Sequence, residues 1–144
     1  MKFLNTIYCG YKNFCTRTVS TAIVHAGIDM LVGIGGAPEA VVSAVALKCL
    51  GGEIQGRLLP NNEQEYNRCL QMGITDPAKP IRMEQFVRSN DCIFVATGIT
   101  EGLLLHGVRS IGKEIAVTHS LLAYGCIPKI HFIESVHQKA LVNK

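Results

Sequence analysis

The sequence has 144 residues, of which 48% are hydrophobic and 17% charged, and its formal net charge is +3. This length and balance suit one globular domain and exclude a largely disordered chain. The Lys and Arg residues form no cluster that would follow a phosphate backbone, so nucleic-acid binding is not expected. The six cysteines form no C-x-x-C pair, which favours a reduced, cytoplasmic protein over a disulfide scaffold or a zinc knuckle.

The N-terminal residues 1–18 show no clean periodicity, and we expect an atypical, loosely packed segment. A short helix over 21–25, capped by Ser20, is predicted to follow it. The most apolar stretch, 23–50, is interrupted by charged residues, so no membrane span is predicted. We expect a single α/β domain over 19–138 and a frayed tail over 139–144.

The stretch from Ile28 to about Leu50 has the pattern of a buried strand, a glycine turn and a helix. Residues 28–34 form a nearly continuous apolar run, which is typical of a strand covered on both faces. Pro38 suits the first position of a helix, because its missing N–H would be unpaired there anyway. Gly51 and Gly52 are expected to end this helix.

The remaining elements alternate at first and are mostly strands later. We predict a mixed sheet flanked by helices, an α/β (α+β layered) fold. Asn61 or Asn62 is expected to cap the second of the helices. The predicted strands are 53–59, 92–96, 103–109, 114–122 and 129–137, and the predicted helices are 63–72 and 83–88.

Residues Gly33 to Glu39 lead into a helix N-terminus, where free N–H groups and the helix dipole favour an anion. A dinucleotide fold would need a glycine where Pro38 stands, and a Walker loop would need a Lys-Ser or Lys-Thr pair. A divalent cation between Glu39 and a phosphate is a third hypothesis, because the carboxylate alone would repel the phosphate. Glu39 could also simply complement the helix dipole, and the residues alone leave these hypotheses open.

A second candidate lies at the end of a predicted strand. Residues 97–102, Thr-Gly-Ile-Thr-Glu-Gly, could line a ligand pocket or form a glycine-rich turn. Arg57 is a possible phosphate partner or an ordinary surface residue. His119 has no second ligand at metal spacing, which favours a structural histidine.

Three blocks of sequence carry a resemblance to a known family. They are 29–39 (D-M-L-V-G-I-G-G-A-P-E), 51–58 (G-G-E-I-Q-G-R-L) and 96–102 (A-T-G-I-T-E-G). Their order and spacing resemble the C-terminal portion of class II, or GlpX-type, bacterial fructose-1,6-bisphosphatases. The resemblance extends from about residue 19 to about residue 133.

This resemblance implies the layered fold of the sugar and inositol phosphatases, of which this chain would be the C-terminal half. It implies a cytoplasmic, metal-dependent hydrolase that removes the 1-phosphate of fructose 1,6-bisphosphate in gluconeogenesis. The implied cofactor is Mn²⁺ or Mg²⁺, with Glu39 as a metal ligand and Gly36 as a substrate-binding residue. A sugar bisphosphate is the implied small-molecule partner.

The sequence also departs from the family. The other metal-binding carboxylates belong to an N-terminal half that this sequence does not resemble. Thr16-Arg17-Thr18 stand where the family has Asp-Gly-Asp, and Ala123-Tyr124 replace a family arginine. We therefore expect no catalytic residue in this chain and little or no phosphatase activity from it alone.

Two alternatives remain open at this stage. The chain could be a non-catalytic remnant that binds a sugar phosphate or assembles with another subunit. More weakly, it could be a nucleotide-binding α/β domain. A half-fold would expose apolar surface, so we also expect self-association into a homo-oligomer.

Overall fold

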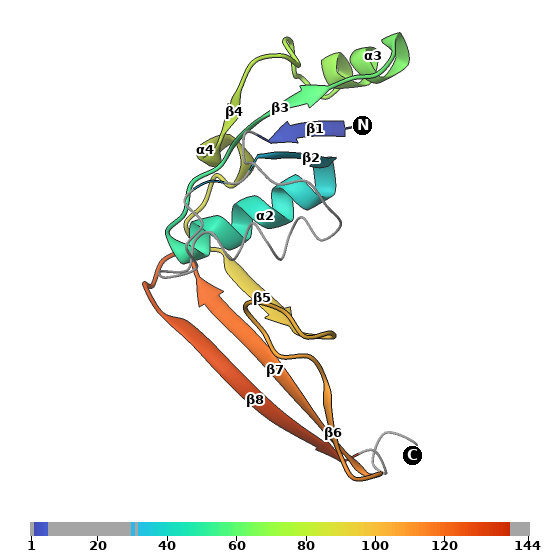
Figure 1. Ribbon diagram of the computed structural model, residues 1–144. Helices are drawn as coiled ribbons and strands as arrows, with labels where there is room; N and C mark the ends of the chain where they lie inside the picture. Colours follow the sequence, from blue (N-terminus) through green and yellow to red (C-terminus); the bar gives the residue numbers. More distant parts are fainter. Residues whose placement is uncertain (1, 6–29, 31, 139–144) are drawn as a thin grey trace.

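A computed structural model describes residues 2–5, 30 and 32–138 of the protein. The helix predicted over 21–25 and the tail predicted from residue 139 lie outside these residues. Two antiparallel sheets of four strands each lie on either side of one long helix, α2 (Ala37–Leu50) (Figure 1). None of the helices in the described ranges combines the length and apolarity needed to cross a bilayer.

The first sheet has the order β2-β1-β3-β4. Strand β1 (Lys2–Asn5) pairs antiparallel with both β2 (Gly33–Gly36) and β3 (Gln55–Leu59), and β3 pairs with the short β4 (Ile81–Arg82). The start of the chain therefore fills a central position of this sheet. We expected residues 1–18 to be loosely packed; residues 2–5 of this segment form strand β1, and the other residues of the segment lie outside the described ranges.

Helix α2 begins directly after β2, without the glycine turn that we predicted. Gly36 is at once the last residue of β2 and the N-cap of α2, and Pro38 takes the second helical position. The strand thus extends two residues beyond the predicted end at Ile34. The predicted end of the helix is confirmed: Gly51 is left-handed with φ 77°, and its N–H donates to the Leu47 carbonyl.

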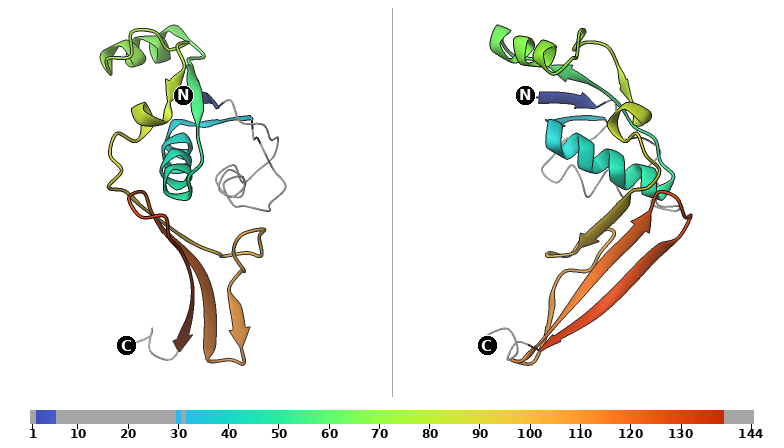
Figure 2. Two further views of the ribbon diagram at one scale, coloured as in Figure 1. Left: turned by 90° about the vertical axis from the view of Figure 1, so that its left-hand side faces the viewer. Right: turned by 180° about the vertical axis from the view of Figure 1, so that it is seen from behind.

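The two shorter helices also follow the sequence signals. Helix α3 (Glu63–Gln71) begins after Asn62, whose side chain accepts a hydrogen bond from the Glu65 N–H at 2.9 Å. Helix α4 (Met83–Phe86) is a single turn and ends two residues before the predicted Arg88. Both helices lie beside the first sheet (Figure 2).

The second sheet is built around the long strand β7 (Ile115–Tyr124). Strands β5 (Ile93–Thr97) and β6 (Arg109–Ile111) pair along one edge of β7, and β8 (Ile130–Gln138) pairs along the other. The strand predicted over 103–109 was wrong, because most of these residues belong to a loop between β5 and β6. A short apolar run such as Leu-Leu-Leu does not by itself distinguish a strand from a packed loop.

The core lies where α2 packs between the two sheets. Ala40, Ala44 and Leu47 of α2 join clusters with residues of β3, α3 and α4. At its other end, Cys49 packs with Leu121 and Ala123 of β7 and with the even-numbered residues of β5. We call the face of the second sheet that contacts α2 the inner face, and the opposite face the outer face.

The α+β layering that we predicted is confirmed, but the expected mixed sheet is not. Every pair of neighbouring strands in the described residues is antiparallel. A dinucleotide-binding fold is built on parallel strands joined by helices, so this topology gives no support to the nucleotide-binding alternative.

Candidate functional site

The predicted residues Gly36 and Glu39 lie together at the N-terminus of α2. Gly36 has φ −75° and ψ 160°, which any residue can adopt, so its backbone conformation does not require glycine. A Cβ at Gly36, however, would lie 2.2 Å from Glu39 Oε2. The Glu39 carboxylate therefore folds back over Gly36, and the missing side chain leaves room for it.

Charged side chains at both ends of α2 interact favourably with its dipole. Glu39 is exposed in the first turn, where a negative charge is favourable by about 0.3–1 kcal/mol. Lys48 lies in the last turn, and its Nζ donates to the Val87 carbonyl at 2.6 Å. The dipole hypothesis for Glu39 is thus consistent with its position, as is a role as a metal ligand.

Within the described part of the chain, no three His, Cys, Asp or Glu side chains gather in a way that could hold a metal ion. Mn²⁺ and Mg²⁺ require several oxygen ligands in defined geometry. One glutamate at a helix N-terminus does not meet this requirement. The residues described here therefore do not by themselves fit the metal that the family resemblance implies.

The second candidate, residues 97–102, begins a loop that closes on itself. The Glu101 carboxylate accepts from His106 Nδ1 at 2.8 Å and from the Gly107 N–H at 3.1 Å. The hydrogen bond from His106, followed by that from Gly107, holds the pKa of Glu101 below its usual value of 4.5. Thr97 and Ser120 share a hydrogen bond of 2.8 Å between their hydroxyl groups.

Two glycines of this loop are required by close contacts. A Cβ at Gly98 would lie 2.2 Å from the carbonyl oxygen of His106, and one at Gly107 would lie 2.7 Å from the Glu101 nitrogen. At Gly102 the nearest atom would be 3.5 Å away, an ordinary contact. The glycines therefore form a tightly folded turn, which agrees with the glycine-rich-turn interpretation of residues 97–102.

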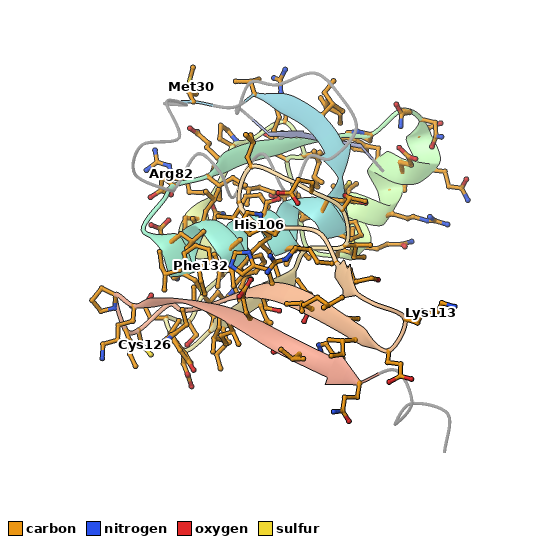
Figure 3. All side chains as sticks on the ribbon, turned by 60° about the horizontal axis from the view of Figure 1, so that its bottom comes forward. Met30, Arg82, His106, Lys113, Cys126 and Phe132 are labelled. Atoms are coloured by element: carbon orange, nitrogen blue, oxygen red, sulfur yellow. The ribbon has the colours of Figure 1, made fainter. Side chains whose placement is uncertain are left out.

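His119 is held as a structural histidine. Its Nδ1 accepts from the backbone N–H of His106 at 3.1 Å. Its ring stacks on His106 at 5.0 Å and on Phe132 at 5.6 Å between ring centroids. Figure 3 shows His106 and Phe132 on the side of the second sheet that faces α2. This stack attaches the loop to the inner face.

The two candidates are not joined into one site. Helix α2 contacts the second sheet through its C-terminal residues, including Val45 and Cys49, whereas Gly36 and Glu39 lie at its other end. Arg57 is exposed on β3, opposite Leu4 of β1. Sequence reasoning missed His106, because its pairing with Glu101 depends on a loop closure that leaves no periodic signal.

Comparisons with known proteins agree on one family. The family model described as bacterial fructose-1,6-bisphosphatase, glpX-encoded, matches residues 15–137. The Escherichia coli K12 protein named fructose-1,6-bisphosphatase 1 class 2 is 41% identical over 133 residues, which cover 83% of this chain and 39% of that protein.

Two further relatives give similar values. The class 2 fructose-1,6-bisphosphatase of Haemophilus influenzae is 37% identical over 133 residues, with the same coverage of 83% and 39%. The Synechococcus protein named D-fructose 1,6-bisphosphatase class 2/sedoheptulose 1,7-bisphosphatase is 38% identical over 136 residues, covering 86% of this chain and 39% of that protein. The chain thus spans about 39% of the length of these relatives, and on the family match it belongs to the class 2, GlpX-type bacterial fructose-1,6-bisphosphatases.

Proposed function

We propose that this chain forms the C-terminal part of a metal-dependent sugar bisphosphatase. In this proposal Glu39 supplies one ligand to a Mn²⁺ or Mg²⁺ ion, and Gly36 lies against the substrate, fructose 1,6-bisphosphate. The observation that carries it is the placement of the Glu39 carboxylate over Gly36 at a helix N-terminus, where N–H groups and the dipole favour a phosphate.

The chain is not expected to hydrolyse the substrate by itself. Phosphoryl hydrolysis assisted by metal ions needs several carboxylates that hold the ions and orient the water. The described residues bring no such group together, and Glu39 is a single ligand. In this proposal the remaining ligands belong to the part of the relatives that this chain does not match.

Phosphate release from fructose 1,6-bisphosphate with Mn²⁺ tests this proposal. We expect no turnover from the chain alone, and turnover when it is co-expressed with the remaining part of the E. coli class 2 enzyme. Glu39→Gln should lower the rate of the reconstituted enzyme by about 10²-fold or more, as expected when an essential metal ligand is lost.

Glu63→Gln is the matched control, because Glu63 also lies in the first turn of a helix and is exposed. It removes the same dipole interaction from α3 and should leave the rate unchanged. If the two substitutions changed the rate equally, Glu39 would act only through its favourable interaction with the helix dipole. Turnover by the chain alone, at the rate of an intact class 2 enzyme, would refute the need for further ligands.

A further inference from the structure

Cys49 and Cys92 place two thiols in contact where α2 meets the second sheet. Their sulfur atoms lie 3.7 Å apart, although 43 positions separate the two residues in the sequence. Cys49 lies in the last turn of α2, and Cys92 directly precedes β5. Both thiols are free in the structure. Two sulfur atoms in contact meet the first requirement for a disulfide bond, since cysteines that lie far apart cannot be bridged without backbone movement.

The backbone around this contact holds the two thiols in place. Cys49 is fixed by its helix and packs in the apolar cluster that attaches α2 to the second sheet, and Cys92 packs against the same cluster. The Cys92 N–H donates to the Asn90 carbonyl, and its carbonyl accepts from the Gly125 N–H, both at 2.9 Å. A Cβ at Gly125 would lie 2.5 Å from Cys92 Sγ. The turn between β7 and β8 therefore packs directly against this sulfur atom.

We infer that Cys49 and Cys92 are a redox-sensitive pair, which a low-molecular-weight disulfide such as glutathione disulfide converts to a disulfide bond. The Cys92 thiolate attacks one sulfur atom of the oxidant, breaks its S–S bond and releases one small thiol. Cys49 then attacks the Cys92 sulfur of this mixed disulfide and displaces the second small thiol. The two protons of the protein thiols end on the two small thiols, and two electrons pass from the protein to the oxidant.

The surroundings of the two thiols set the order of these steps. Cys92 is half-buried, whereas Cys49 is buried. Burial, followed by the hydrogen bond with Cys92, raises the pKa of the Cys49 thiol to about 12. This thiol therefore stays protonated at neutral pH and is a poor nucleophile toward an external oxidant. Cys92 meets the oxidant and Cys49 resolves the mixed disulfide, slowly, because it must first lose its proton.

The other two cysteines in the described residues are placed differently. Cys69 is buried in a separate cluster with Ala40 and Leu58. Cys126 is exposed in the turn between β7 and β8, and it is the competing partner for Cys92 because it follows Gly125. A third interpretation treats the paired thiols only as small apolar side chains of the core, and it predicts no cross-link at all.

A disulfide between Cys49 and Cys92 would tie α2 covalently to the second sheet. It would close a loop over the 43 positions between them, which include β3, α3, β4 and α4. Closing such a loop removes conformational freedom from the unfolded chain. The oxidised protein should therefore be more stable than the reduced protein.

Oxidation of the folded full chain with glutathione disulfide at about pH 8 tests the inference. The remaining thiols are blocked with N-ethylmaleimide, and the protein is digested with trypsin without reduction. Each of the six cysteines falls in a different tryptic peptide, Cys49 in 49–57 and Cys92 in 89–109. We expect these two peptides to be linked, about tenfold or more in excess over links of either one to Cys69 or Cys126. Dithiothreitol should release them.

Thermal unfolding measures the effect on stability. Oxidation should raise the melting temperature of the wild type by about 5–10 °C. Cys49→Ala should abolish this rise, and Cys92→Ala is a second variant that removes the other half of the pair. Cys126→Ser is the matched control, since it removes an exposed thiol outside the pair, and it should keep the full rise.

Several outcomes would overturn the inference. They are oxidation without a link between the two peptides, Cys126 as the main partner of Cys92, and a melting rise that persists in both alanine variants. The same yield of the link from a chain unfolded in urea would also contradict it, because the fold would then not select the pair. The peptide map uses the wild type, so it decides the question even where a variant fails to fold.

Discussion

Three glycines of this protein are explained by the atoms that lie against them. Gly36, Gly98 and Gly107 have no unusual torsion angle that would demand glycine, yet a Cβ at each would clash with a neighbouring atom. At Gly36 the neighbour is the carboxylate of Glu39, a flexible side chain, and at the other two it is backbone. Substitution at Gly98 or Gly107 should therefore affect folding, whereas substitution at Gly36 should mainly move the carboxylate.

Gly98→Ala should lower the free energy of unfolding by about 1–3 kcal/mol, because the backbone of His106 must shift to admit the methyl group. Gly102→Ala in the same loop is the control, since its Cβ would make only an ordinary contact at 3.5 Å. Urea unfolding of both variants measures the difference. Equal midpoints for the two variants would contradict the close packing of this loop.

The Glu101 carboxylate should make the loop between β5 and β6 sensitive to acid. Its pKa is lowered in the folded state by the hydrogen bonds from His106 and Gly107. Its contribution to stability is therefore fully present above the unfolded pKa and is lost as the pH falls through the lowered folded value. Between about pH 5 and pH 3, stability should fall more steeply for the wild type than for Glu101→Gln.

Chemical denaturation at a series of pH values tests this expectation. Glu114→Gln, at an exposed position before β7, is the control and should keep the wild-type slope. The Gly107 amide signal, followed by NMR, should shift with the same titration in the wild type only. Identical pH profiles for the wild type and Glu101→Gln would show that these hydrogen bonds do not contribute to folding.

At the scale of elements, local chemistry predicted the helices better than the sheets. The left-handed Gly51 and the capping Asn62 are local signals, and α2 and α3 end or begin where these residues predict. Strand β1 has no such signal, because its position depends on pairing with β2 and β3 far along the chain. The antiparallel directions of the strands and the loop found in place of the strand predicted over 103–109 also depend on contacts between distant parts of the chain.

The candidate site shows the same division. The glycine block and Glu39 were found from local pattern and family resemblance, and the structure brings Gly36 and Glu39 together. The contact between Glu101 and His106 could not be predicted, since it needs the chain to fold back across two glycines. Which face of β5 is uncovered also follows only from the register with β7.

Strand β1 is expected to be essential to the first sheet. Because it pairs on both sides, Leu4→Pro removes a backbone donor from the middle of the ladder. The free energy of unfolding should fall by about 1–3 kcal/mol, because the ladder loses a hydrogen bond and its acceptor is left unpaired. Leu4→Val, which keeps the N–H, is the control in thermal unfolding. A Leu4→Pro protein with the melting temperature of the control would contradict the central position of β1.

Across the whole molecule, α2 is the element on which both sheets depend. It contributes Leu47 and Ala40 to the clusters on the side of the first sheet and Cys49 to the cluster on the second. Cys49 and Cys92 approach to 3.7 Å between their sulfur atoms, at the contact of α2 with β5. Burial, followed by the hydrogen bond with Cys92, raises the pKa of the Cys49 thiol to about 12.

The rate of thiol labelling should therefore report how often α2 separates from the second sheet. Cys126 is exposed in the turn between β7 and β8 (Figure 3) and should react first among the cysteines in the described residues. Cys49 and Cys69 are buried and should react only through opening of the structure, at rates that rise with urea. Mass spectrometry resolves each cysteine, and labelling of Cys49 as fast as Cys126 would contradict the packing of α2 on the second sheet.

The central position of β1 has a consequence for the order of events during synthesis. Lys2–Asn5 are synthesised well before one of their partners, β3, which is complete only at Leu59. Strand β1 therefore cannot complete its pairing until β2, α2 and β3 have all been made. The β7–β8 hairpin pairs neighbours in sequence and can close as soon as it emerges. In refolding experiments this hairpin should gain protection from hydrogen exchange before the strand that begins the chain.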